Sequence, residues 1–354
     1  MTDVIVFLGI FLTIVTFLFN IGISIAQTHR SYRLHHAESF YSLCLCVFAL
    51  IFSFIVVMNF IIFDFLYGFI VTLTAGIVFL LFGIFNVIQY LLDRRKSSPS
   101  HSEIDFSTRD NLRHEIFRKI FHIILFFGII ALLLIGYLII ESLYLQGSDL
   151  PGVEETYHNY WGRLDGLGMW NIQFNFGQSV IFMLFILLTT IFVMNEGARL
   201  LKWFYFPLRK LASFGIREKE KDTVASYVYF TIGMVFAATF IYPLPLFSII
   251  GILCFADTAA SLFGRKYGRH KLSFNPTKSW EGSIGGFIVC LIVTILIVGP
   301  IWGICATIVF FVIDAITPKI PISDNIGIPV GVALTYFLLS ILQIPMQSIV
   351  FSLL

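Results

Sequence analysis

Residues 283–316 read SIGGFIVCLIVTILIVGPIWGICATIVFFVIDAI and contain a single charged side chain, that of Asp314. Two apolar runs, 283–299 and 301–316, make up this stretch, and they could form one hairpin. Each run is too long and too continuously apolar for a barrel strand, in which polar and apolar residues alternate. Because a chain in lipid must satisfy its own backbone hydrogen bonds, we expect both runs to be membrane helices.

The same pattern extends over the whole chain. Of its 354 residues, 58% are hydrophobic and 12% are charged, and a soluble domain carries about twice that share of charge. We therefore predict an all-α, polytopic integral membrane bundle of about ten transmembrane helices. The candidate spans are 4–26, 39–63, 65–92, 119–140, 176–194, 224–241, 243–263, 283–299, 301–316 and 328–352.

The basic residues predict the orientation of this bundle. Lys and Arg gather in the loops after alternate spans, whereas the long loop 141–175 is acidic and holds only Arg163. With ten helices, all 23 basic residues except Arg163 lie on one side, which the positive-inside rule makes cytoplasmic. We predict an N-terminal three-helix unit (1–92), a cytoplasmic linker (93–118) and a seven-helix membrane domain (119–354).

A polar, basic island interrupts the apolar pattern at 257–286, DTAASLFGRKYGRHKLSFNPTKSWEGSIGG. Cations around a glycine-rich turn suit a polyphosphate, and one or two carboxylates among them suit the Mg²⁺ that travels with it. This composition favours a membrane protein that handles a nucleotide and a lipid together. The residues concerned are Gly264, Arg265, Lys266, Gly268, Arg269, Lys271, Lys278 and Glu281.

The chain has no Walker A sequence, so another element must hold any nucleotide. Asn275 is a favoured N-cap and Pro276 a favoured first helical residue, which would put Lys278 and Ser279 in the first turn of a helix. Such a turn is a phosphate site. Alternatively, it is only a capped transmembrane helix with a lysine on the cytoplasmic side.

Asp257 lies within the apolar sequence FADTAASLF. A carboxylate inside a membrane is costly, so a function is the first hypothesis for it. Helical spacing puts Asp257, Ser261 and Gly264 on one face, where Gly264 would let a nucleotide approach the backbone. Asp257 could bind Mg²⁺ or take a proton from a lipid hydroxyl, or it could be a structural partner of a neighbouring Arg.

Three motifs resemble the polyprenol kinase family, which includes dolichol kinases, phytol kinases and CTP-dependent diacylglycerol kinases. They are RKIFH at 118–122, the DTAAS…KSWEGS segment at 257–283, and SDN at 323–325. The first 100 residues carry none of the resemblance. The segment 257–286 also resembles CTP-dependent phosphatidate cytidylyltransferases, but the C-terminal signature usual in those enzymes is absent from DAITPKIPISDNIGIP, which favours the kinase.

The resemblance implies a lipid-alcohol kinase that uses CTP with Mg²⁺ to phosphorylate a polyprenol such as dolichol, or phytol or diacylglycerol. Its cytoplasmic site would lie in the endoplasmic reticulum or plasma membrane, and no nucleic acid is involved. The residues it implies for catalysis are Asp257, Lys278, Arg118, Lys119 and His122. Residue chemistry and the resemblance together predict nucleotide binding by Gly264, Arg265, Lys266, Gly268, Lys271, Ser279, Glu281 and Asn325. They also predict metal binding by Asp257, Glu196 and Asp324, where Glu196 is a candidate because it lies at the end of a membrane span.

Simpler explanations stand beside several of these assignments. Arg118 and Lys119 could only anchor a helix at the membrane surface, and Glu196 could simply pair with Arg199 three residues later. Asp324 and Asn325 could form a turn and helix cap. The alternative activities are a cytidylyltransferase acting on a lipid phosphate and a transporter with a polar gating loop.

Overall fold

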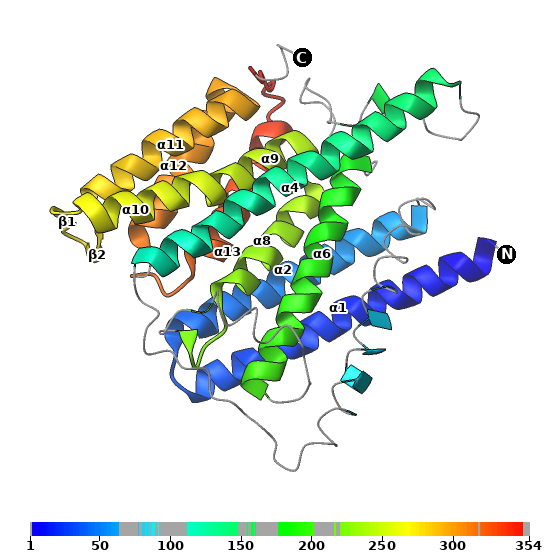
Figure 1. The fold of residues 1–354 in the computed structure, drawn as a ribbon, viewed down its shortest axis with the longest axis horizontal. Helices are drawn as coiled ribbons and strands as arrows, with labels where there is room; N and C mark the ends of the chain where they lie inside the picture. The colour runs from blue at the N-terminus through cyan, green and yellow to red at the C-terminus, as the bar shows by residue number, and fades with distance from the viewer. Residues whose placement is uncertain are drawn as a thin grey trace. The chain divides into compact units, whose positions relative to one another are not determined.

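Figure 1 shows a computed structural model of the chain. It describes residues 2–63, 112–147, 176–201, 220–317 and 319–349, together with scattered positions between 77 and 91, between 154 and 160, and at 216. Most of the predicted span 65–92, the linker region 93–111, and most of the loops 148–175 and 202–219 lie outside the described residues.

The described residues are almost entirely helical, which confirms the prediction of an all-α membrane bundle. Seven helical segments are long and apolar enough to cross a membrane, and two shorter apolar helices, 226–240 and 300–316, accompany them in the described part of the chain. The α-helices are α1 (Thr2–Arg33), α2 (Ala37–Phe63), α4 (Leu112–Leu145), α6 (Phe176–Glu196), α8 (Ser226–Phe240), α9 (Pro243–Gly251), α10 (Asp257–Tyr267), α11 (Trp280–Val298), α12 (Pro300–Ile316) and α13 (Asp324–Ile341).

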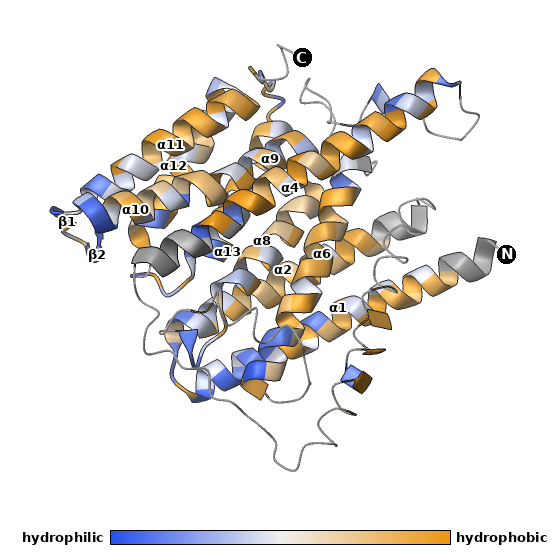
Figure 2. Cartoon of the chain, in the orientation of Figure 1, coloured by the Kyte–Doolittle hydropathy of each residue, from blue (hydrophilic) through white to orange (hydrophobic). Residues whose placement is uncertain are grey.

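Hydropathy follows these helices closely. Figure 2 shows them mostly hydrophobic along their lengths, while the short hairpin of β1 (Lys271–Leu272) and β2 (Asn275–Ser279) is hydrophilic. The two strands pair antiparallel, with Lys271 opposite Ser279 and Leu272 opposite Asn275. The polar island of the sequence is therefore a helix end followed by a small hairpin.

Two helices contain a π-helical turn next to an acidic residue. Segment η1 (Gly197–Leu201) directly follows Glu196 at the end of α6, and segment η3 (Ile252–Ala256) directly precedes Asp257. The helices α9 and α10 are thus one continuous span, Pro243–Tyr267, with a π turn in its middle. Single π turns occur often at functional sites.

The predicted hairpin of 283–299 and 301–316 is confirmed as α11 and α12. Gly299 joins them with φ +89°, a left-handed conformation that favours glycine, and Pro300 occupies the first turn of α12. A Cβ at Gly299 would also lie 2.3 Å from the carbonyl oxygen of Gln347. The turn therefore has both a conformational and a steric need for glycine.

The last helix differs from its predicted bounds, 328–352. It begins at Asp324 because Ser323 caps it, the Ser323 side chain accepting a hydrogen bond from the Asn325 backbone N–H. It ends at Ile341, and Gln343 just beyond has φ +56°. The earlier start brings Asp324 into the first helical turn.

The chain divides into two compact units that each combine separate parts of the sequence. Unit 1 consists of 1–118 and 183–235, and unit 2 of 119–182 and 236–354. The predicted boundary after residue 118 coincides with a unit boundary, but unit 1 also takes in part of the predicted C-terminal domain. In unit 1, α1 packs along α2; in unit 2, α11 packs against α10 and α12.

Candidate functional site

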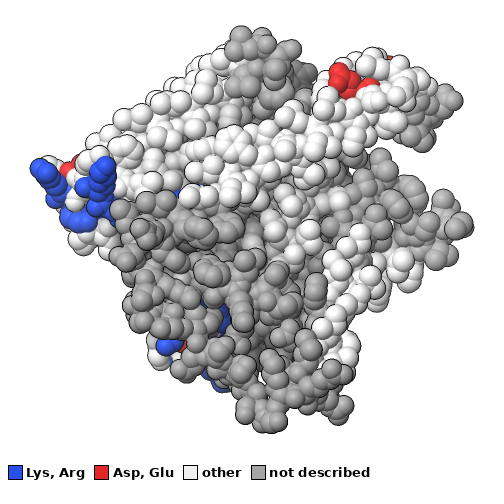
Figure 3. Space-filling view, in the orientation of Figure 1, with Lys and Arg blue, Asp and Glu red and all other residues white. Residues whose placement is uncertain are grey.

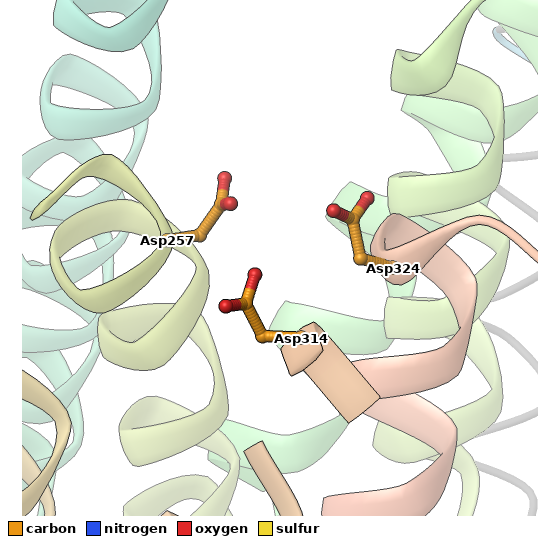
Figure 4. Close-up of side chains that lie close together, drawn as sticks. All are labelled: Asp257, Asp314 and Asp324. Carbon is orange, nitrogen blue, oxygen red and sulfur yellow. The ribbon is translucent and has the colours of Figure 1, made fainter. Parts of the chain in front are cut away.

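Three aspartates from three helices converge in unit 2. Asp257 begins α10, Asp314 lies near the end of α12, and Asp324 begins α13. Each offers one carboxylate oxygen, and these oxygens all lie within 4.8 Å of one another. Figure 4 shows the three side chains pointing toward a common space. We call Asp257, Asp314 and Asp324 the aspartate trio.

The trio combines burial with partial access. The Asp314 side chain is 2% exposed, whereas Asp257 and Asp324 retain 18% and 28% of their exposure. Asp324 lies in the first turn of its helix, where the helix dipole stabilises a negative charge. The site therefore combines one buried carboxylate with two that remain open to a ligand.

Two lysines accompany the trio. Lys119 on α4 is almost fully buried and pairs with Asp257. Lys278 on β2 lies 2.5 Å from Asp314 and 3.8 Å from Asp324. Burial lowers the pKa of Lys278, but the carboxylates of Asp314 and Asp324 outweigh it, so its pKa is raised and the ammonium stays charged. Two positive charges thus face three negative ones.

The hairpin places Lys278 in a way that corrects the sequence prediction. Asn275 does not cap a helix, and Lys278 does not lie in a first turn, because 275–279 forms β2 and the helix begins at Trp280. The buried Asn275 amide instead donates to the carbonyl oxygens of Ala315 and Thr317, each at 2.8 Å. This fastens β2 to the end of α12, next to Asp314.

Ser279, predicted to bind phosphate, is the actual N-cap of α11. Its hydroxyl accepts a hydrogen bond from the Gly282 N–H at 3.3 Å. The serine is buried and serves the helix directly. Capping of α11 therefore accounts for Ser279 without a contact to a nucleotide.

The residues of the motif RKIFH, 118–122, differ in their relation to the trio. Lys119 contacts Asp257 directly, and His122 lies three residues further along the same helix, α4. The carbonyl oxygen of His122 accepts a hydrogen bond from the Cys254 thiol at 3.0 Å, which helps to hold α4 against the π turn. The side chain of Arg118 lies outside the described residues, so its predicted phosphate contact stays a prediction.

The two predicted nucleotide-binding glycines face α11 and its cap. A Cβ at Gly264 would lie 3.4 Å from the Ser279 hydroxyl oxygen, and one at Gly268 only 2.6 Å from it. On the other side of this contact, a Cβ at Gly282 would lie 2.8 Å from the Ala260 carbonyl oxygen. These glycines let α10 and α11 pack closely, which accounts for them without a bound nucleotide.

The basic residues of the island lie on the surface of the hairpin end. Arg265, Lys266 and Lys271 are exposed, and Figure 3 shows Lys and Arg gathered at this end of the molecule. Lys266 lies 5.1 Å from the Tyr267 ring centre. Glu281 accepts hydrogen bonds from the His270 backbone N–H at 3.1 Å and lies 2.6 Å from the His270 ring nitrogen Nδ1. The described contacts of Lys266 and Glu281 are thus with Tyr267 and His270, at the hairpin end.

Glu196, predicted to bind metal, lies in unit 1 with its side chain fully buried. Arg199 donates to both of its oxygens, at 3.0 and 2.5 Å, and the Tyr227 hydroxyl and Ala225 N–H donate at 2.5 and 3.1 Å. Four donors occupy the acceptor positions of one carboxylate. The geometry therefore favours the structural explanation and gives no reason to assign Glu196 to a metal.

Asn325 and Asp314 have roles that the sequence did not make clear. Asn325 donates its amide to Asp324 at 2.9 Å, so it orients a member of the trio. Asp314 is not among the residues that the sequence predicts for the site. The signal that could have found it is the one used for Asp257, a lone carboxylate in a long apolar run.

The donor chemistry of the trio fits a hard divalent cation. Mg²⁺ prefers carboxylate oxygens, and it keeps open positions for water and phosphate when only a few protein groups bind it. Asp257 and Asp324 were predicted as metal ligands, and Asp314 completes the set. The two lysines supply cations that a phosphate can contact.

Comparison with known proteins adds two partial matches. The chain is 30% identical over 80 residues to "Phytol kinase 1, chloroplastic" from Arabidopsis thaliana, covering 22% of this chain and 26% of that protein. It is 32% identical over 116 residues to "Phytol kinase" from Synechocystis sp., covering 29% of this chain and 49% of that protein. The chain thus spans at most about half the length of these curated relatives. No family model and no solved structure matches. The matches support the predicted membership of the polyprenol and phytol kinase family.

Proposed function

We propose that this protein is an integral membrane lipid-alcohol kinase whose site is the aspartate trio with Lys119 and Lys278. The observation that carries the proposal is the convergence of Asp257, Asp314 and Asp324 within 4.8 Å, beside two lysines. The partial matches to phytol kinases support the same activity.

In this proposal, the hydroxyl oxygen of the lipid attacks the γ-phosphorus of a nucleoside triphosphate. The bond between that phosphorus and the β,γ-bridging oxygen breaks, and a nucleoside diphosphate leaves. The hydroxyl proton passes to a carboxylate of the trio. Lys119 and Lys278 hold phosphate oxygens and balance the charge on the transferred group, which is how positioning and electrostatics accelerate such a reaction.

Asp257, Asp314 and Asp324 would hold Mg²⁺ between them. When bound, the cation neutralises phosphate charge and helps to align the reacting groups. The trio alone would place three negative charges against a triphosphate, so the two lysines and the cation together make the site compatible with its substrate.

We further propose CTP as the phosphoryl donor, on the basis of the family resemblance, and a polyprenol, phytol or diacylglycerol as the acceptor. The name of both relatives makes phytol the first alcohol to test. We place the site on the cytoplasmic side because the basic loops predict that orientation.

The test uses purified full-length protein with Mg²⁺, phytol, dolichol or diacylglycerol, and CTP or ATP labelled either in the γ-phosphoryl group or in the base. We expect the γ-label to enter the lipid and the base label to stay in solution. Asp257→Asn is the inactive control, and Lys266→Gln is the matched control, since Lys266 is exposed and its described contact is with the Tyr267 ring.

Two results would contradict the proposal. Base label in the lipid would mean a cytidylyltransferase, which attacks the α-phosphorus and releases pyrophosphate. Absence of label from every alcohol with both nucleotides, in protein that remains folded, would reject the kinase and leave a transporter as the alternative to examine.

A further inference from the structure

A row of buried polar side chains runs along one face of α1 in unit 1. Its members are spaced three or four residues apart, as residues on a single helix face must be. Each retains at most 3% of its exposure. They are Thr13, Thr16, Asn20, Ser24, Gln27 and Ser31.

The row is nearly as long as a membrane is thick. At 1.5 Å per residue, Thr13 and Ser31 lie about 27 Å apart along the helix, compared with about 30 Å for the hydrocarbon core of a bilayer. Another face of the same helix exposes Phe11, Leu18 and Ile25, as expected for contact with lipid. The polar face therefore lies inside unit 1 within a candidate membrane span, Phe7–Arg33.

Helix α6 meets this row. The Asn20 amide nitrogen donates to the Thr190 hydroxyl at 2.9 Å and to the Thr16 carbonyl oxygen at 3.0 Å. Thr189 and Asn195, on the same part of α6, are also buried polar residues. The two helices thus bring hydroxyl and amide groups together inside unit 1.

Many of these polar atoms have no hydrogen-bond partner among the described residues. A buried polar atom left in that condition costs free energy, and the cost is higher where water is excluded. Seven such atoms lie on α1 and α6. They are Thr13 Oγ1, Asn20 Oδ1, Ser24 Oγ, Gln27 Nε2 and Oε1, Thr189 Oγ1 and Asn195 Oδ1.

The chemistry of the group selects its ligand. Gln27 Nε2 can only donate, the amide oxygens of Asn20, Gln27 and Asn195 can only accept, and the hydroxyls can do both. A metal cation would leave the amide donor unsatisfied, and an anion would leave the amide oxygens unsatisfied. Water serves both kinds of atom, and polar cavities in proteins commonly hold ordered water.

We propose that unit 1 holds a file of bound water molecules along α1, from Thr13 to Gln27, where Asn20 meets Thr190 of α6. This hydrated row gives the polar face of α1 its hydrogen bonds inside the membrane. It is independent of the proposed kinase activity, because none of its residues belongs to the aspartate trio or its lysines.

The first test is hydroxyl-radical footprinting of the full-length wild-type protein in lipid nanodiscs, with X-ray radiolysis in H₂¹⁸O. Phe17 and Met194 are each 1% exposed, and they lie one turn from Asn20 and Thr190 on the two helices. Radicals formed from bound water react where they arise, so we expect ¹⁸O on both side chains despite their burial. Gln27→Met should reduce this labelling.

The second test compares two threonines of equal burial. Thr16 donates its hydroxyl to the Leu12 carbonyl oxygen at 2.8 Å, whereas Thr13 Oγ1 belongs to the group without a described partner. We expect Thr13→Val to lower the apparent Tm by about 2–4 °C through loss of a water-mediated hydrogen bond. Thr16→Val is the matched control for loss of an ordinary helix hydrogen bond and should leave the labelling unchanged.

The proposal is overturned if Phe17 and Met194 carry no ¹⁸O and both Thr13→Val and Gln27→Met raise the apparent Tm. That result would mean a dry row in which the polar atoms are simply unsatisfied. An apparent Tm that depends on exchanging potassium or sodium for choline, with no ¹⁸O at either side chain, would instead assign the row to an alkali cation.

Discussion

The carboxylate of Glu196 in unit 1 and the aspartate trio in unit 2 show two ways of burying negative charge in a membrane protein. Glu196 has one guanidinium group, one hydroxyl and one backbone N–H around its two oxygens, so its charge and its hydrogen bonds are both satisfied. The trio has three carboxylates beside two ammonium groups, so its described ion pairs contain one carboxylate more than they have ammonium groups.

This difference separates a structural acid from one suited to a ligand. A saturated carboxylate can gain little from a metal or a phosphate, because its existing donors would have to leave. A crowded group of carboxylates gains from a divalent cation, since the cation removes their mutual repulsion. Glu196 and Asp257 each lie next to a π turn. The two carboxylates therefore differ in the hydrogen-bond donors around them and not in the local backbone.

The largest expected effect is on the stability of unit 1. Glu196→Ala leaves Arg199 buried without its carboxylate, which should lower the free energy of unfolding by about 3–5 kcal/mol. Thermal unfolding in detergent, followed by fluorescence size-exclusion chromatography, measures the loss. A fully stable Glu196→Ala protein would mean that the cluster does not hold the end of α6 in place.

A change in the trio should act mainly on catalysis. Asp257→Asn keeps the side-chain shape but removes the carboxylate, so we expect the phosphorylation rate to fall by about 10³-fold, or ~4 kcal/mol. It also leaves the buried Lys119 without its charged partner, so the Tm should fall as well, and the rate is measured on the folded fraction. Asp314→Asn should lower the rate by a similar factor. More than about a tenth of the wild-type rate in Asp257→Asn would remove this residue from the catalytic site.

Lys278→Ala tests whether the Lys278 ammonium group contributes to use of the nucleotide at the trio. Loss of a preorganised charge donor should reduce kcat/KM for the nucleotide by on the order of 2–4 kcal/mol. The steady-state kinetics are compared at saturating lipid, with Lys271→Ala on the opposite strand as the control. Equal effects of the two substitutions would mean general charge attraction in place of a specific contact.

The smallest expected effect concerns the exposed cations of the hairpin. Lys266→Gln changes a solvent-exposed charge beside Tyr267 and should alter the rate by less than about 0.5 kcal/mol at moderate salt. Rates measured at several salt concentrations check this. A loss comparable to that of Lys278→Ala would return Lys266 to the nucleotide site that the sequence first suggested.

Hydrophobic composition predicted the helical membrane bundle, because apolar runs of membrane length leave little choice of structure. The sequence also pointed to Asp257, whose carboxylate stands out in an apolar run. It could not reveal that Tyr227 and Ala225, about thirty residues after Glu196, complete a cluster around that acid. The spacing of Glu196 and Arg199 predicted their ion pair, but it did not predict that further donors would complete the hydrogen bonds of the Glu196 carboxylate.

Local signals also competed at the hairpin. Asn275 and Pro276 have the residue types of a helix start, yet Asn275 forms two tertiary hydrogen bonds to α12 and the chain continues as a strand. The prediction that Lys278 lies in the first turn of a helix was therefore wrong, because Lys278 lies on β2 beside Asp314. Asp314 is brought to the site by the packing of α12 against α11 and α13 and of α11 against α10, which depends on contacts between separate helices.

The π turn Ile252–Ala256 determines how the side chains of α10 are rotated about the helix axis relative to those of α9. It contains one residue more than an α-helical turn needs, so deleting a single residue there would let an uninterrupted α-helix form. Each residue of an α-helix corresponds to about 100° of rotation. Such a deletion would turn Asp257 away from Asp314 and Asp324, or would turn the preceding half of the span out of its packing. The extra residue of the π turn thus sets the direction in which the Asp257 carboxylate points. Deleting it should disturb the site more than a substitution within the turn, because a substitution keeps the number of residues before Asp257 unchanged.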